Sequence, residues 1–86
     1  MSMEETIFSS EQNMSREEIA ESLRSIAEGV SKGKVGLESG DSSIEVTPGE
    51  NCEFEVKVEK EDDGDTSLEI ELEWNDEKGN DKIKIN

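Results

Sequence analysis

The sequence lacks histidine and tyrosine altogether, and its 86 residues include only one cysteine and one proline. Without histidine, the chain has no side chain that ordinarily titrates near neutral pH, which removes the usual general acid or base. The single cysteine, Cys52, cannot form a disulfide within the chain, and no histidine is present to activate it as a nucleophile. We therefore expect no catalytic residues, no cofactor and a reducing compartment.

Basic residues are also scarce, with nine lysines and arginines against 24 aspartates and glutamates, which gives a net charge of −15. Binding to nucleic acids or anionic membranes needs clustered basic residues, so we expect neither kind of partner. No apolar run approaches the roughly 20 residues that span a bilayer, and the first ten residues lack the segments of a signal peptide. We expect a cytoplasmic protein whose surface suits a basic protein partner.

Apolar residues make up only 29% of the chain, close to the composition of disordered proteins, but they recur at the spacings of regular structure. Ser15 and Glu18 have the spacing of a helix-capping box, and the apolar residues after them repeat every three or four positions. This pattern predicts a helix that starts after Ser15 and ends at either Gly29 or Gly33. Its apolar stripe contains Ile19, Leu23, Ile26 and Val30.

Two short stretches with alternating apolar residues follow the helix, joined by Gly40-Asp41, a pair that suits a two-residue type II′ turn. That turn places apolar residues opposite one another, in the pairs Val35–Val46 and Leu37–Ile44. A three-residue loop at 48–50 would carry the alternation into the next strand, because it sets Val46 opposite Cys52.

The clearest strand is Leu68–Trp74, LEIELEW, in which apolar residues alternate with glutamates, so that one face is apolar and the other anionic. A three-residue loop at Asp62–Gly64, with Gly64 left-handed, joins this strand to the preceding one. The predicted pairs are Phe54–Leu72, Val56–Ile70 and Val58–Leu68. A five-residue loop would also keep the apolar residues together, and it would pair Phe54 with Trp74.

Both ends of the chain are less regular. We expect residues 1–5 to be disordered and residues 6–10 to form a short first strand, whose pairing the sequence leaves open. After Trp74, Gly79-Asn80 is typical of a hairpin turn, and Ile83 and Ile85 alternate with lysines. Residues 75–86 are therefore predicted to be a C-terminal extension, either a final strand or a flexible tail.

Together these elements predict an α+β fold with two layers, in which one helix packs on a mainly antiparallel sheet of five or six strands. The order is β-α-β-β-β-β, with the short C-terminal strand as the sixth, and residues 6–74 form a single domain. The apolar sides of the helix and the sheet would form the core. Its predicted members are Ile19, Leu23, Ile26, Phe54, Val56, Leu68, Ile70, Leu72 and Trp74.

From residue 6 to residue 74 the chain resembles the amphi-Trp domain, a small prokaryotic family named for an amphipathic strand that ends in tryptophan. The resemblance rests on the helix start SREEIAESL, on the G-K-V entry to the next strand, and on FEVKVEK and LEIELEW. It implies a domain-sized unit of archaeal and bacterial proteins, with no catalytic residues to carry over. The segment after Trp74 would extend beyond the usual end of the domain.

The glutamates of the two long strands predict one anionic face, on which Glu55, Glu69, Glu71 and Glu73 would dock a basic partner. The plainer interpretation is a solvated surface, since runs of charge usually face water. A metal site needs converging oxygens, and the acidic turn lacks the last acid of an EF-hand loop, where Ile70 falls. We therefore predict no metal ligands, and only loose binding of divalent cations stays open.

Two single residues have both a structural and a functional interpretation. Cys52 is predicted to be a small buried hydrophobe rather than a nucleophile. Trp74 is predicted to pack in the core, with an aromatic contact at an interface as the alternative. The sequence thus predicts a non-catalytic interaction or accessory domain, monomeric or weakly dimeric. The alternative is a soluble protein whose surface is adapted to salt or stress and has no specific partner.

Overall fold

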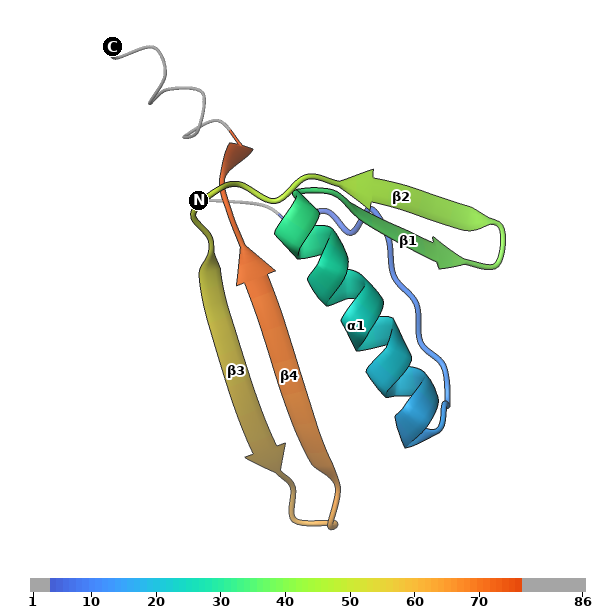
Figure 1. The fold of residues 1–86 in the computed structure, drawn as a ribbon. Helices are drawn as coiled ribbons and strands as arrows, with labels where there is room; N and C mark the ends of the chain where they lie inside the picture. The colour runs from blue at the N-terminus through green and yellow to red at the C-terminus, as the bar shows by residue number, and fades with distance from the viewer. Residues whose placement is uncertain (1–3, 77–86) are drawn as a thin grey trace, which may run out of the picture. The chain divides into compact units, whose positions relative to one another are not determined.

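The computed structural model describes residues 4–76, which contain one helix and four strands (Figure 1). The strands form two separate two-stranded antiparallel sheets, β1 with β2 and β3 with β4. The chain divides into two compact units, Met1–Thr47 and Pro48–Asn86, and each is described by itself. In chain order the elements are α1 (Arg16–Lys32), β1 (Val35–Ser39), β2 (Ser42–Val46), β3 (Glu53–Lys60) and β4 (Thr66–Glu73).

Helix α1 begins where the capping box predicted. The Ser15 hydroxyl accepts the Glu18 backbone N–H at 3.2 Å, and the Glu18 carboxylate accepts the Ser15 backbone N–H at 3.1 Å. The helix continues past Gly29 and stops at Gly33, whose φ of 83° is left-handed. Of the two ends that the sequence left open, the structure therefore has the later one.

Gly29 has a different role, at the point where the chain turns back from α1 into β1. A Cβ atom at this position would lie 2.7 Å from the carbonyl oxygen of Lys34 and 3.1 Å from the Cα of Val35. The Lys34 backbone N–H donates to the Gly29 carbonyl at 2.9 Å, so the close approach is part of the helix end. Val35 follows directly and, with 6% of its surface exposed, is the one buried apolar side chain among residues 4–76.

In the first unit, β1 and β2 form the predicted hairpin around Gly40-Asp41, and β1 contacts α1. Gly40 has a φ of 58°, the positive value that a type II′ turn requires at its first position. The register prediction is confirmed, because the structure contains both expected pairs, Val35–Val46 and Leu37–Ile44.

In the second unit, β3 and β4 form a longer hairpin. The Glu61 backbone N–H donates to the Asp65 carbonyl at 2.8 Å, which leaves Asp62–Gly64 as a three-residue loop. Gly64 has a φ of 98°, so it takes the left-handed position of this loop. The five-residue alternative is excluded, because the structure contains the pairs Phe54–Leu72, Val56–Ile70 and Val58–Leu68.

The prediction of one helix on a single sheet of five or six strands is wrong, because β2 and β3 belong to different sheets. The connection between them is held instead by contacts within the second unit. The Cys52 thiol donates to the Gly49 carbonyl at 3.2 Å, and Gly49 lies against Trp74. Matching of apolar residues decides which register two strands would have if they paired, but it does not decide whether they pair.

The predicted first strand at residues 6–10 is also wrong, since residues 4–15 contain no strand and the element order is α-β-β-β-β. Ile7 is 69% exposed, whereas its neighbour Phe8 is half-buried. Adjacent residues of a strand point to opposite faces, so this segment offers no apolar face that pairing with a sheet would bury. The predicted turn at Gly79-Asn80 and the final strand lie outside the residues that the structure describes.

Candidate interaction surface

One side of the β3–β4 hairpin carries every charged side chain of the two strands except Lys60, and we call it the carboxylate face. Alternation along each strand places every second side chain on this side. The face contains Glu53, Glu55, Lys57 and Glu59 of β3 and Glu69, Glu71 and Glu73 of β4. All four residues predicted to dock a partner therefore share one face, and Glu53 and Glu59 add two more carboxylates.

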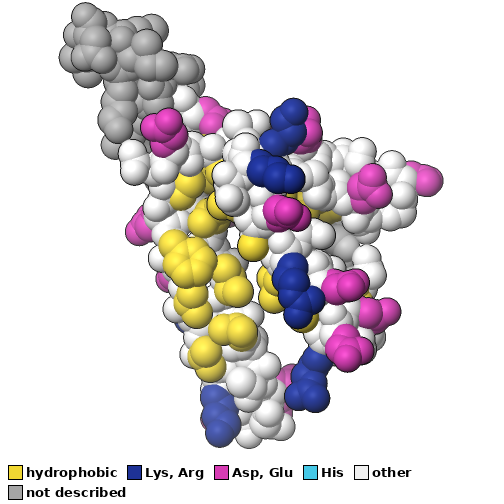
Figure 2. All heavy atoms as spheres, in the orientation of Figure 1, with side chains coloured by type: hydrophobic (Ala, Val, Ile, Leu, Met, Phe, Trp, Pro, Cys, Tyr) yellow, Lys and Arg dark blue, Asp and Glu magenta, His cyan; other side chains and the backbone are white. Residues whose placement is uncertain are grey.

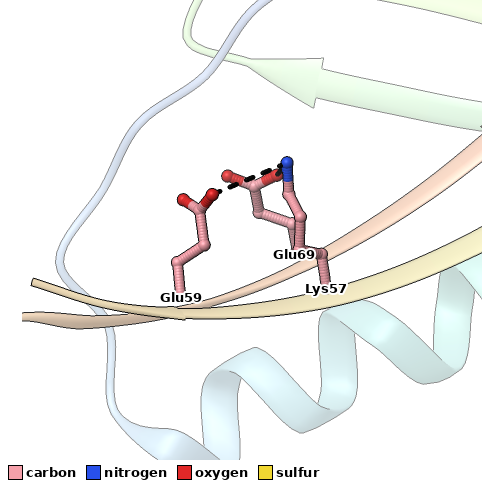
Figure 3. A network of polar contacts seen from close by, with 3 residues as sticks. All are labelled: Lys57, Glu59 and Glu69. Atoms are coloured by element: carbon pink, nitrogen blue, oxygen red, sulfur yellow. Dashed lines mark ion pairs between the residues drawn. The ribbon is translucent and has the colours of Figure 1, made fainter.

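Lys57 organises the end of the carboxylate face that lies toward the turn (Figure 3). Its ammonium nitrogen lies 3.8 Å from a carboxylate oxygen of Glu59 on the same strand and 3.7 Å from one of Glu69 on β4. The three side chains are about half exposed, so each ion pair contributes at most about 1 kcal/mol. Figure 3 shows all three pointing to the same side of the hairpin, where Lys57 partly neutralises both glutamates.

The other end of the face carries two like-charged pairs, Glu53 opposite Glu73 and Glu55 opposite Glu71. Side chains directly opposite on an antiparallel pair have Cβ atoms about 4.5–5.5 Å apart, so like charges there repel. Within residues 4–76, no lysine or arginine forms an ion pair with any of these four glutamates. This end of the face therefore has carboxylates in excess.

The effect of this crowding is visible at Glu55. A side-chain hydrogen bond with Glu71 is the largest cause that raises the pKa of Glu55, and the negative charge of Glu71 is the next. Partial desolvation and the charges of Glu53 and Glu69 raise it further. A protonated Glu55 carboxyl can donate to the Glu71 carboxylate, which replaces a repulsion between the strands by a hydrogen bond.

The opposite side of the same hairpin is apolar, and Figure 2 shows apolar side chains gathered over β3 and β4. Phe54, Val58 and Leu68 are each 65% exposed, whereas Leu72 is half-buried. In the first unit, the apolar stripe of α1 is exposed by 36–46% at Ile19, Leu23 and Ile26. That these residues form one common core stays a prediction. Val35, which is buried, was missing from the predicted core, because the close approach of Gly29 to it is seen only in the structure.

Trp74 stands at the end of β4 and contacts the loop that leads into β3. A Cβ atom at Gly49 would lie 3.6 Å from the Trp74 Cβ and 3.8 Å from its Cδ1, an ordinary packing distance. The indole N–H donates to the Asp76 carboxylate at 2.9 Å, and the side chain is half-buried. Trp74 thus links the end of β4 to the loop before β3.

A sequence model of the Amphi-Trp domain matches residues 1–86, the whole chain. The chain belongs to the Amphi-Trp domain family. The resemblance predicted from the helix start and from LEIELEW is therefore confirmed. Searches of curated proteins and of solved structures gave no match. In the part of this Amphi-Trp domain that the structure describes, no helix is long and apolar enough to cross a membrane.

The turn of this Amphi-Trp domain between β3 and β4 brings three exposed carboxylates together. Oxygen atoms of Glu61, Asp63 and Asp65 all lie within 4.8 Å of one another. The Asp63 carboxylate accepts the Asp65 backbone N–H at 3.0 Å, so it already stabilises the turn. The spacing lacks the last acid of an EF-hand loop, where Ile70 stands, so the turn does not match that calcium-binding pattern.

Proposed function

We propose that this Amphi-Trp domain is a non-catalytic interaction module that docks a basic protein surface on its carboxylate face. The observation that supports this most is the pair of like-charged rungs, Glu53–Glu73 and Glu55–Glu71, next to each other on an exposed hairpin. Like charges directly opposite on a sheet are destabilising. A partner that brings lysines or arginines to this end would relieve the repulsion, so part of the binding free energy is already stored in the free domain.

The exposure of the face predicts the character of such a complex. Charged groups at an exposed surface mainly increase the association rate and the specificity, and their effect is screened by salt. Lys57 already engages Glu59 and Glu69, so the partner's cations would be drawn to the opposite end of the hairpin. We therefore expect transient, salt-sensitive binding centred on Glu55 and Glu71.

The proposal of a non-catalytic role rests on the chemistry that the chain offers. The sequence has no histidine, and the free thiol of Cys52 donates to the Gly49 carbonyl instead of meeting a base. A nucleophile without a neighbouring base has no means of activation. We propose a cytoplasmic setting on the same ground, because a free thiol suits a reducing compartment.

The test uses a labelled lysine-rich peptide as the basic probe and measures its binding by fluorescence anisotropy. A Glu55→Gln/Glu71→Gln double variant should bind about tenfold more weakly than the wild type, the effect of losing two exposed charge pairs. The matched control is Glu17→Gln/Glu21→Gln, which changes the net charge equally on α1. We expect this control to lose no more than about half of the affinity, since its charges lie on another element.

Three results separate the proposal from its alternatives. Equal losses in the two double variants would show attraction by net charge alone, which is what a salt-adapted surface without a partner predicts. No binding by the wild type even at about 0.01 M salt, where screening is weakest, would remove the docking proposal. Competition by millimolar calcium, but not by an equal ionic strength of sodium chloride, would point to divalent cations instead.

A further inference from the structure

We propose that the β3–β4 hairpin is a proton-sensitive element, in which Glu55 and Glu71 take up one shared proton on mild acidification and the hairpin becomes more stable. The register places the two carboxylates directly opposite each other on the same face of a two-stranded sheet. At this separation two ionised carboxylates repel, whereas a carboxyl and a carboxylate attract through a hydrogen bond. The proposal concerns the chain by itself and needs no partner.

The neighbouring charges make this rung the favoured place for the proton. Within β3 and β4, the rung on one side is Glu53–Glu73, which adds two more negative charges. The rung on the other side is Lys57–Glu69, where the ammonium group is shared between Glu69 and Glu59. The central pair therefore has like charge on one flank and a cation that is already engaged on the other.

The direction of the pH effect follows from the two states of the chain. In the unfolded chain a glutamate has a pKa of about 4.3, whereas in the folded chain the hydrogen bond with Glu71 and the Glu71 charge raise the pKa of Glu55. Above about pH 4.3 the folded state therefore binds more protons than the unfolded state, and the free energy of unfolding rises as the pH falls. This contribution is complete near the ordinary pKa and disappears as the pH rises through the folded-state pKa of Glu55.

The first experiment is a carboxyl-carbon NMR titration of the full wild-type chain at constant ionic strength. The Glu55 resonance should titrate above about pH 4.3, the ordinary value for a glutamate, because its carboxyl stands opposite that of Glu71. A Glu55 midpoint at or below about pH 4.3 would overturn the proposal, whatever the variants do.

The second experiment measures melting temperature between about pH 7.5 and about pH 5, where the unfolded-state glutamates stay mostly ionised. The wild type should melt at a higher temperature at the lower pH. Glu55→Gln places an amide donor where the shared proton would be, so it should be more stable near neutrality and lose much of the pH dependence. Glu21→Gln changes the net charge equally, and it should keep the wild-type pH dependence. Equal slopes in the two variants would assign the effect to net charge and contradict the proposal.

Discussion

Both hairpins of this Amphi-Trp domain keep their apolar residues on one face, but they differ in the charges on the other face. On β1–β2 the second face pairs Gly36 with Glu45 and Glu38 with Ser43, so no two carboxylates stand opposite each other. Glu45 also has a cation, since the Lys34 ammonium lies 3.9 Å from it. On β3–β4, by contrast, two adjacent rungs carry only carboxylates.

The composition of the two units follows the same division. Residues 4–47 contain ten acidic and four basic residues, a net charge of −6, whereas residues 48–76 contain twelve acidic and two basic residues, a net charge of −10. The second, shorter stretch is thus the more acidic one. Since like-charged rungs work against the sheet that carries them, their presence on one hairpin and not the other favours a role outside folding.

Each unit has a packed junction, and that of the first unit, at Gly29, is the tighter one, so Gly29→Ala should have the largest effect. In an ordinary helix position this change would gain up to about 1 kcal/mol. Here the new Cβ would lie 2.7 Å from the Lys34 carbonyl oxygen, so we expect a loss of about 2 kcal/mol or more in denaturant unfolding. Gly36→Ala is the matched control, because a Cβ at Gly36 meets no atom within 4 Å. An equally small effect at both glycines would contradict the close approach.

In the second unit, the contact of Trp74 with the loop before β3 is the counterpart of that junction. Trp74→Ala removes a half-buried ring and its bond to Asp76, so unfolding followed by circular dichroism should show a loss of about 1–2 kcal/mol. Trp74→Phe keeps a ring against Gly49 and loses only the indole donor, so it should cost about 0.5–1 kcal/mol. If the two variants cost the same, the ring packing on Gly49 is not what stabilises the unit.

The dependence of the melting temperature on salt should distinguish the charges of the two hairpins. Between about 0.01 M and about 0.5 M sodium chloride the Debye length falls from about 30 Å to a few ångströms, so repulsion is screened and the melting temperature should rise. Glu55→Gln removes one like-charged rung and should gain less from salt than the wild type. Glu38→Gln, whose partner across the strands is Ser43, should keep the full gain. A melting temperature that is flat or falls with salt would refute the repulsion argument.

The smallest expected effect comes from the ion pairs. Lys57→Gln leaves Glu59 and Glu69 without their shared cation, and it should lower the free energy of unfolding by up to about 1 kcal/mol. Lys34→Gln removes a single, more exposed contact to Glu45 and should have a smaller effect, within about 0.5 kcal/mol. The reverse order in urea titrations would mean that Lys57 does not organise the carboxylate face.

Much of the local structure could be predicted from the sequence, because it depends on residues close together in the chain. The Ser15 and Glu18 side chains cap α1 by contacts over three positions, and Gly33 ends the helix through its own φ. Both hairpin registers follow from turn length and from the two-residue period, since a slip of one residue would exchange the apolar and anionic faces. The carboxylate face is a direct consequence of the second register.

The arrangement of the strands into sheets could not be predicted in the same way. Apolar alternation in β2 and β3 is compatible with one shared sheet and equally with two separate hairpins, and the choice depends on contacts such as that of Gly49 with Trp74. The burial of Val35 likewise depends on the close approach between Gly29 and Val35, which the spacing of apolar residues in the sequence does not indicate. The raised pKa of Glu55 depends on the register, which sets its carboxyl opposite that of Glu71.

The proposal that the carboxylate face docks a basic partner is tested by mapping where such a partner binds. A lysine-rich peptide is added to the isotopically labelled chain, and backbone amide shifts are followed by NMR at low salt. We expect shifts concentrated in β3 and β4, largest around Glu55 and Glu71 and reversed by salt. Shifts of equal size along α1 and β1–β2, or none on β3–β4, would contradict it.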